Sequence, residues 1–223
     1  MMKRLFLLGI LVSFFASASF AQNFIPLKNL PDSLEIEVLN VSVSIEGTDE
    51  TFASYSFVSD TGKKLSCVEN RGTFRIRTVY ESDGIIRIKI PKTHLIERMR
   101  ITSALASITV KNISVVHTHI LLTRGDIDIS GCQFKTSVLT QNTGSLLFSA
   151  GVKSSALCLT NVEARVQYLG EKDEYHIDYS CAGSYLNVNG QVLTNLQGVY
   201  GENNAQKRSI ISLSHSNASV SFP

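Results

Sequence analysis

The sequence contains no tryptophan and only four prolines. Without tryptophan, the chain cannot form the tryptophan-lined platforms on which sugar rings stack. With four prolines in 223 residues, it has no proline-rich linker. Charge is also sparse, because charged residues make up 18% of the chain and hydrophobic residues 43%. This balance is typical of a folded protein and argues against disorder.

The first 21 residues have the pattern of a secretory signal peptide. Lys3-Arg4 forms a short positive region, and a largely apolar run from Leu5 to Phe15 follows it. Ser19 and Ala21 place small residues at both positions that a signal peptidase reads, so we expect cleavage after Ala21. The run is shorter than the roughly 20 apolar residues that span a bilayer. We therefore predict an exported mature chain without a transmembrane segment, located in the periplasm, at the outer surface or in the medium.

Removal of the signal peptide makes the chain electrically neutral. The whole sequence carries a formal charge of +2, with a pI of about 8.3. Of its 21 basic residues, Lys3 and Arg4 lie in the leader, which leaves 19 against the 19 acidic residues. A neutral chain has no excess of positive charge with which to bind nucleic acid or an anionic membrane. The sequence therefore predicts no nucleic-acid partner.

After residue 30, apolar and polar residues alternate with a period of two in nearly every segment. Leu34, Ile36 and Val38 form one apolar stripe, and turn residues such as Asn70-Arg71-Gly72 separate such runs. This alternation is typical of half-buried β-strands joined by tight turns. We predict an all-β protein in which residues 22–99 form a region of antiparallel strands that caps the rest of the chain.

From about residue 100, the sequence repeats every 19 residues. A constant period with stacked apolar columns is typical of a solenoid, in which each coil buries its apolar face against its neighbours. Gly125 and Gly144 recur before the second strand of a coil, where a corner favours glycine. We predict that residues 100–223 form a right-handed parallel β-helix-like solenoid with about 19 residues per coil, and that residues 22–223 are one structural domain. The apolar columns are Ile101, Ile120, Leu139, Cys158 and Ile177; Ile108, Ile127 and Leu146; Val110, Ile129 and Phe148; and Ile113, Cys132 and Gly151.

Four segments resemble the bacterial putative-adhesin domain, a family of β-strand repeats of unknown function. The similarity covers residues 34–222, and it departs from the family pattern where Glu163 and Asn217 replace the expected glycine. The resemblance implies a parallel β-helix-like envelope protein with no established catalytic residues. Members of the family repeat a Gly-polar-apolar-polar-apolar unit, and the segments that carry the resemblance are Gly84–Pro91, Arg124–Ile129, Asn142–Leu147 and Ala182–Val188.

The four cysteines, Cys67, Cys132, Cys158 and Cys181, are open to two interpretations. An even number of cysteines in an exported chain permits disulfides. However, Cys158 and Cys132 fall in apolar columns, where a thiol packs like an aliphatic side chain. Buried free thiols are the favoured interpretation, with at least one disulfide as the alternative.

Two histidines are candidate metal ligands. His117 and His119 lie two residues apart and point to one face of a strand, as zinc ligands can. The positions one coil further on are Thr136 and Val138, and neither completes a zinc site. The sequence therefore predicts no metal site.

Candidate catalytic carboxylates also lack the partners that their chemistry requires. Asp60-Thr61-Gly62 matches the aspartic-protease motif, but that chemistry needs two such loops, and the sequence has one. Asp126 and Asp128 alternate with core residues and project outward, yet the matching positions in the neighbouring coils carry no carboxylate. We predict no catalytic and no cofactor-binding residues.

The outward positions of the repeat are mostly serine, threonine, asparagine, glutamine and lysine. Such a face forms either a solvated wall, which the sequence favours, or a weak extended binding surface. We predict an exported, non-catalytic β-solenoid of the cell envelope or surface that serves as an adhesin or scaffold for an unknown envelope, host or glycan partner. A polysaccharide-acting β-helix enzyme and a periplasmic assembly or regulatory partner are the alternatives.

Overall fold

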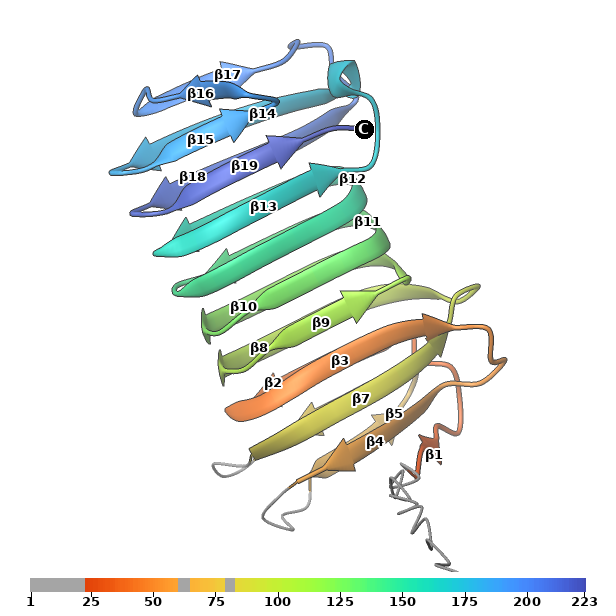
Figure 1. The fold of residues 1–223 in the computed structure, drawn as a ribbon. Coiled ribbons are helices and arrows are strands. Elements are labelled where there is room, and N and C mark those ends of the chain that lie inside the picture. The colour runs from red at the N-terminus through yellow and green to blue at the C-terminus, as the bar shows by residue number, and fades with distance from the viewer. Residues whose placement is uncertain (1–22, 60–64, 79–82) are drawn as a thin grey trace, which may run out of the picture.

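The computed structural model describes residues 23–59, 65–78 and 83–223. The strands join into one continuous curled sheet, which confirms the prediction of an all-β protein (Figure 1). Within the described ranges the helical structure consists of a single short 3-10 turn, η1 (Lys172–Glu174). The signal peptide and the Asp60-Thr61-Gly62 motif lie outside the described residues.

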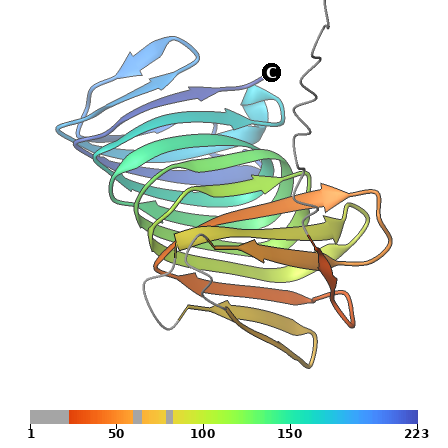
Figure 2. The same ribbon diagram turned by 60° about the horizontal axis from the view of Figure 1, so that its bottom comes forward.

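The chain runs back and forth between two walls of strands that enclose the apolar core (Figure 2). Within each wall, all neighbouring strands pair in parallel. In stacking order, wall 1 consists of β6 (Thr73–Arg77), β2 (Ser33–Val38), β8 (Leu95–Leu105), β10 (Ser114–Arg124), the second parts of β11 (Ile127–Gln141) and β12 (Gly144–Thr160), β18 (Lys207–Ser214) and β14 (Tyr175–Ala182). Wall 2 consists of β7 (Asp83–Pro91), β3 (Asn40–Thr48), β9 (Ile108–Lys111), the first parts of β11 and β12, β13 (Val162–Tyr168), β19 (Asn217–Ser221) and β15 (Tyr185–Val188).

Antiparallel strands cover both ends of the stack. They protect the end strands from pairing with other chains, as short edge strands do. The prediction of antiparallel strands before residue 100 is correct for β1, β4 and β5, but wrong for β2, β3, β6 and β7, which pair in parallel within the walls. Alternation marks a strand but does not give the direction of its neighbour. The covering strands are β4 (Ser54–Val58) on β7, β1 (Ile25–Pro26) on β4 and β5 (Ser66–Asn70) on β6 at one end, and β16 (Gln191–Leu193) on β15 and β17 (Gln197–Tyr200) on β14 at the other.

The order of the coils in space differs from their order in the sequence at both ends. The first coil, β2–β3, lies between β6–β7 and β8–β9. The last coil, β18–β19, lies between β12–β13 and β14–β15, although it follows both in the chain. The outermost coils of the stack are therefore β6–β7 and β14–β15, and neither of them is the first or the last coil in the sequence.

The predicted apolar columns are present over the middle coils, with one shift. Ile101, Ile120 and Leu139 are register partners, as the period of 19 predicts. The next member is Leu157 rather than Cys158, because Gly131 has no partner where β11 and β12 pair. This one-residue bulge shortens the following repeat and moves every later side chain to the other face. Beyond Leu157 the column continues through residues of β18 and β14, so the prediction of Ile177 as the next member is also wrong.

The other columns mostly follow the prediction. Ile108, Ile127 and Leu146 are buried register partners, as are Val110, Ile129 and Phe148. In the fourth column the partner of Cys132 is Ala150, and Gly151 pairs instead with Gln133. The same unpaired Gly131 explains this second shift.

Candidate binding surface on wall 2

The outward side chains of wall 2 form three rows that run across its strands, because alternate residues of a strand point to the same side. Figure 1 looks onto this outer face. We call the part of it over β11, β12, β13, β19 and β15 the wall-2 surface. Its rows are Ser145, Glu163, Asn217 and Tyr185; then Asp128, Leu147, Arg165, Ser219 and Asn187; then Ser130, Ser149, Gln167 and Ser221.

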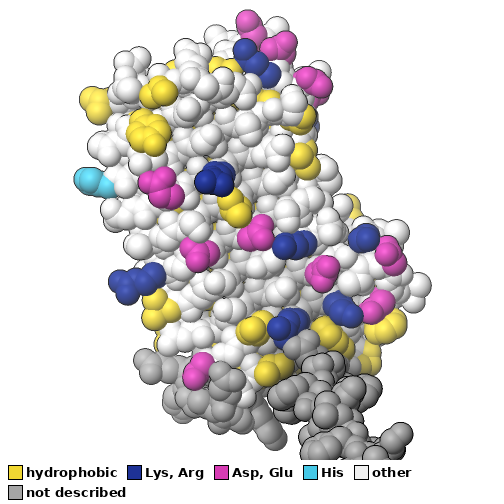
Figure 3. Space-filling model, viewed as in Figure 1, with side chains coloured by type: hydrophobic (Ala, Val, Ile, Leu, Met, Phe, Trp, Pro, Cys, Tyr) yellow, Lys and Arg dark blue, Asp and Glu magenta, His cyan; other side chains and the backbone are white. Residues whose placement is uncertain are grey.

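Two adjoining hollows lie in the wall-2 surface. Their volumes are about 530 Å³ and about 380 Å³. Leu147, Arg165 and Ser219, all from the central row, line both of them. Figure 3 shows that this face carries isolated charged side chains among mostly uncharged atoms. The hollows therefore form a shallow, mainly neutral groove with an arginine at its centre.

Hydrogen bonds between rows and strands hold the rim of the groove. Asp126 Oδ1 accepts hydrogen bonds from Ser145 N at 3.0 Å and from Ser145 Oγ at 2.7 Å. Asn217 Nδ2 donates to Glu163 Oε1 at 2.9 Å. These contacts fix polar side chains that would otherwise be free to rotate, which lowers the entropic cost of binding a ligand.

The centre of the groove, in contrast, has unengaged groups. Arg165 is exposed and makes no ion pair or side-chain hydrogen bond with any residue that the structure describes. Leu147 is 47% exposed beside it, and Tyr185 is 45% exposed at one end of the groove. The surface thus offers a guanidinium, an aromatic ring and a set of hydroxyl and amide groups to a ligand.

The two outward aspartates of β11 and its preceding turn are engaged by neighbouring side chains. Asp126 binds Ser145, and Asp128 lies 3.3 Å from Lys111 Nζ. Asp128 pairs in register with Thr109 and Leu147, as the sequence predicts. The structure therefore keeps both carboxylates on the outer face and brings no second acidic side chain into register with Asp128.

The two candidate metal ligands, His117 and His119, lie on the outer face of wall 1. His117 Nδ1 is 2.8 Å from Thr136 Oγ1, and its Nε2 is 3.9 Å from Glu97 Oε1. Within residues 23–59, 65–78 and 83–223, no three histidine, cysteine or acidic side chains are grouped so that they could hold a metal ion.

All four cysteines are free thiols. Cys132 and Cys181 are buried, and burial raises the pKa of both thiols. Burial also raises the pKa of Cys67, which is only partly exposed. Cys158 is exposed, so its predicted place in the apolar column is wrong; the bulge at Gly131 turns it outward.

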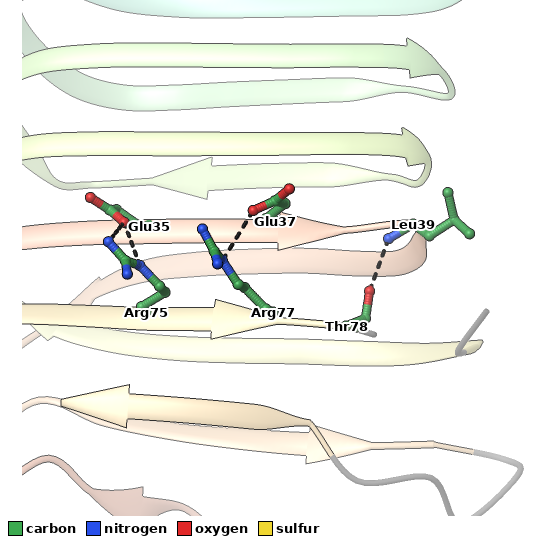
Figure 4. Close-up of polar contacts among 6 residues, drawn as sticks. All are labelled: Glu35, Glu37, Leu39, Arg75, Arg77 and Thr78. Atoms are coloured by element: carbon green, nitrogen blue, oxygen red, sulfur yellow. Dashed lines mark hydrogen bonds and ion pairs between the residues drawn. The ribbon is translucent and has the colours of Figure 1, made fainter. Parts of the chain in front are cut away.

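A ladder of ion pairs on wall 1 joins β2 to β6 (Figure 4). Glu35 pairs with Arg75, and Glu37 Oε2 lies 3.1 Å from Arg77 Nε. The sequence contains the signal for this ladder, since Glu-x-Glu and Arg-x-Arg stand on two strands with the same alternation. Sequence reasoning missed the pairing because it placed these strands antiparallel. It missed the groove around Arg165 because the register of β13 depends on the bulge.

In the ranges that the structure describes, no helix has the length and apolar character needed to cross a membrane.

No protein-family model matches the chain. An uncharacterized protein of Treponema pallidum (strain Nichols) is 29% identical over 176 residues, which cover 77% of this chain and 72% of that protein. Among solved structures, a putative cell adhesion protein from Clostridium sporogenes aligns with a TM-score of 0.40 and 10% identity, over 91% of this chain and 100% of its own. A putative adhesin from Bacteroides fragilis aligns with a TM-score of 0.39 and 8% identity, over 92% and 98%. A putative lipid binding protein from Parabacteroides distasonis aligns with a TM-score of 0.36 and 11% identity, over 88% and 96%. Scores in this range support no inference about function.

Proposed function

We propose that this chain is an exported, non-catalytic β-solenoid of the cell envelope or surface that binds polysaccharide along the wall-2 surface. Its coils are right-handed, as connections between parallel strands almost always are. The leader in residues 1–21 directs the mature chain out of the cytoplasm. In this role it serves as an adhesin or a scaffold.

One observation carries the proposal: two adjoining hollows share an unengaged guanidinium at Arg165. A guanidinium binds a carboxylate through two parallel hydrogen bonds. Tyr185 offers an aromatic face for the apolar side of a sugar ring, and Asn187 and Ser219 offer hydrogen-bonding groups. This chemistry fits a polysaccharide that contains acidic sugars.

The arrangement of carboxylates supports binding rather than hydrolysis. Most glycosidases place two carboxyl groups on opposite sides of the bond that they cleave, one of them free to donate a proton. Here Glu163 accepts a hydrogen bond from Asn217, and Asp126 is held by Ser145. The acidic side chains at the groove therefore serve to orient its rim.

An array of immobilised neutral and acidic polysaccharides tests the proposal. The mature protein should bind acidic polysaccharides, and Arg165→Ala should weaken that binding at least about tenfold, since a charge-assisted pair contributes roughly 1.5–3 kcal/mol. Arg124→Ala removes an exposed arginine from the end of β10 in wall 1 and should leave binding unchanged. Equal binding by both variants, or release of reducing ends from the bound polysaccharide, would contradict the proposal.

A further inference from the structure

Wall 1 carries four exposed, nitrogen-bearing side chains on two neighbouring strands. Arg98 and Arg100 of β8 pair in register with His117 and His119 of β10, and we call these four residues the basic array. All four point outward, because they alternate with buried side chains such as Met99. Neighbouring strands lie about 4.8 Å apart, and alternate residues of a strand about 7 Å apart. The four side chains are therefore close enough to contact one small ligand together.

The positive charge of the basic array is left open. Arg98, Arg100 and His119 make no ion pair and no side-chain hydrogen bond with any residue that the structure describes. Glu35 is the register neighbour of Arg100 on β2, but its carboxylate accepts a hydrogen bond from Arg75 Nε at 2.6 Å. The carboxylate nearest in register is thus engaged by another arginine, and two guanidinium groups stand side by side without a counter-charge.

A second acidic neighbour, Glu97, faces a histidine of the array. Glu97 Oε1 lies 3.9 Å from His117 Nε2, and His117 Nδ1 is 2.8 Å from Thr136 Oγ1. These two contacts orient the His117 ring at one corner of the array. Among the described residues, Glu97 makes no ion pair with either arginine, so both guanidinium groups remain available to a ligand.

We propose that the basic array binds a phosphate group. A guanidinium donates two parallel hydrogen bonds to a phosphate, and a phosphate monoester carries close to two negative charges. Its three terminal oxygens can accept hydrogen bonds from two guanidinium groups and an imidazole together, whereas a carboxylate has only two oxygens. The array therefore favours phosphate over the carboxylate of an acidic sugar, and it forms a site separate from the wall-2 surface.

A hollow of about 280 Å³ beside the basic array indicates what carries the phosphate. Arg100 and Thr102 of β8 line it, together with the ion pairs that join β2 to β6 (Figure 4). Apart from Ile36, the lining consists of charged and hydroxyl-bearing side chains. Such a lining forms hydrogen bonds with hydroxyl groups and disfavours acyl chains. The phosphate is therefore one carried by glycerol or a sugar.

NMR titrations in phosphate-free buffer test the proposal. Glycerol 3-phosphate should cause saturable shifts in the signals of the four residues of the basic array, and glycerol should cause none. Glucuronate, which carries a carboxylate on a sugar, should bind there at least about tenfold more weakly. Phosphatidylcholine vesicles with and without phosphatidic acid identify the source of the phosphate. Binding to the phosphatidic acid vesicles identifies a lipid headgroup, and binding of glycerol 3-phosphate alone identifies a soluble phosphorylated polyol; either supports the site.

Substitution of the arginines separates the array from a general attraction to positive charge. Arg98→Ala and Arg100→Ala should each weaken the binding of glycerol 3-phosphate at least about tenfold. Arg208→Ala is the matched control, because Arg208 is exposed, makes no ion pair with any described residue and lies in the row of Arg98, four strands away. It should leave binding unchanged, as should Arg165→Ala in the wall-2 surface. These side chains are exposed, so all four variants should retain the thermal melting temperature.

Three results would overturn the proposal. The first is that neither glycerol 3-phosphate nor phosphatidic acid vesicles shift the signals of the basic array. The second is that glucuronate binds to it as tightly as glycerol 3-phosphate. The third is that Arg208→Ala weakens binding as much as Arg100→Ala, since the net charge of the protein would then attract the ligand rather than the array.

Discussion

Gly125 and Gly144 hold the corners at which the chain passes from wall 1 to wall 2. Both have a φ near +130°, a region that side chains disfavour. A Cβ atom on Gly125 would lie 1.8 Å from the carbonyl oxygen of Ala106, and one on Gly144 would lie 1.8 Å from that of Gly125. The glycines therefore set how closely one coil can approach the next.

Gly125→Ala should lower the free energy of unfolding by roughly 3 kcal/mol or more, because the new methyl group meets backbone that cannot move alone. Urea denaturation measures the change. Gly190→Ala is the matched control, since Gly190 also has a positive φ of 86° but nothing within 4 Å of an added Cβ. It should cost only about 1 kcal/mol. Equal losses for the two variants would mean that close packing at the corner is not what Gly125 provides.

At two of the later corners, before β13 and before β19, the residue is not a glycine. Asn161 and His215 adopt positive φ values of 52° and 49° there, a conformation in which asparagine and histidine are enriched among non-glycine residues. Glu163 and Asn217, the positions at which the family pattern calls for glycine, lie within the following strands. The family pattern therefore predicts the corners at Gly125 and Gly144 correctly. At the two later corners it expects the special residue two positions after Asn161 and His215, because the repeat has shortened at the bulge.

Tyr168 makes stability depend on pH in the alkaline range. Its ring is fully buried, and its hydroxyl group contacts Ser155 Oγ at 3.0 Å and Ser209 Oγ. Burial raises the pKa of Tyr168 to about 12, above the unfolded value of about 10. Because the unfolded chain loses this proton first, stability is fully present below pH 10 and falls as the pH rises toward 12.

The free energy of unfolding should therefore drop by roughly 2–3 kcal/mol between pH 10 and pH 12 through this residue. Tyr168→Phe cannot ionise and should lose that part of the pH dependence, which urea titrations at several pH values measure. Tyr185→Phe, at an exposed position, should keep the slope of the wild type. An unchanged slope in Tyr168→Phe would contradict the assignment.

At the scale of strands, the last coil acts as an internal layer rather than as a tail. β18 pairs with β12 on one side and with β14 on the other. β19 does the same between β13 and β15. The chain must therefore leave space between β12–β13 and β14–β15, which β18 and β19 fill last. Only then do β14 and β15 have parallel neighbours.

Two adjacent residues of β18 test this role. Ile211 is fully buried between the walls, whereas Ile210 is exposed on wall 1. Ile211→Asp should lower the free energy of unfolding by roughly 4 kcal/mol or more, since it buries an unpaired charge. Ile210→Asp should change it by less than about 1 kcal/mol. Thermal and urea melts of the two variants give the comparison, and a tolerant response to both would mean that β18 is a peripheral strand.

The sequence predicted the repeat well where one coil follows another without interruption. The predicted column through Ile120 and Leu139 is confirmed, because apolar side chains of successive coils can stack on one another only where the period is constant. The prediction failed after Gly131, because a single unpaired residue changes the period from 19 to 18 and leaves no sign in composition. The insertion of β18–β19 was also missed, because apolar alternation is the same whichever neighbour a strand meets.

At the scale of the whole molecule, our proposal that the chain is exported places the working protein outside the cytoplasm. We expect the mature protein to begin at Gln22, after cleavage behind Ala21. Mass spectrometry of the protein recovered from outside the cytoplasm should show this N-terminus. A chain that retains Met1 would contradict export. The division into residues 22–99 and 100–223 within one structural domain stays a prediction.

The two outer faces of the stack have different chemistry, and this difference carries the functional account. Wall 2 has a neutral groove around an unengaged arginine, whereas wall 1 carries the exposed apolar side chains of Val138 and Ile210. We propose that polysaccharide binds to wall 2. Along each strand, the outward side chains of both faces alternate with side chains that point into the core. The strands that enclose the core therefore also position the groups that can contact a ligand.

Mapping of a bound acidic polysaccharide by NMR chemical-shift changes tests the central claim most directly. The account predicts that the largest changes fall on the central row of the wall-2 surface, at Leu147, Arg165 and Asn187, and that they saturate with increasing ligand. It also predicts that Arg165→Ala needs at least about tenfold more ligand to reach the same changes. Changes centred on Val138 and Ile210 of wall 1 would contradict the claim, as would a spectrum that no acidic polysaccharide alters.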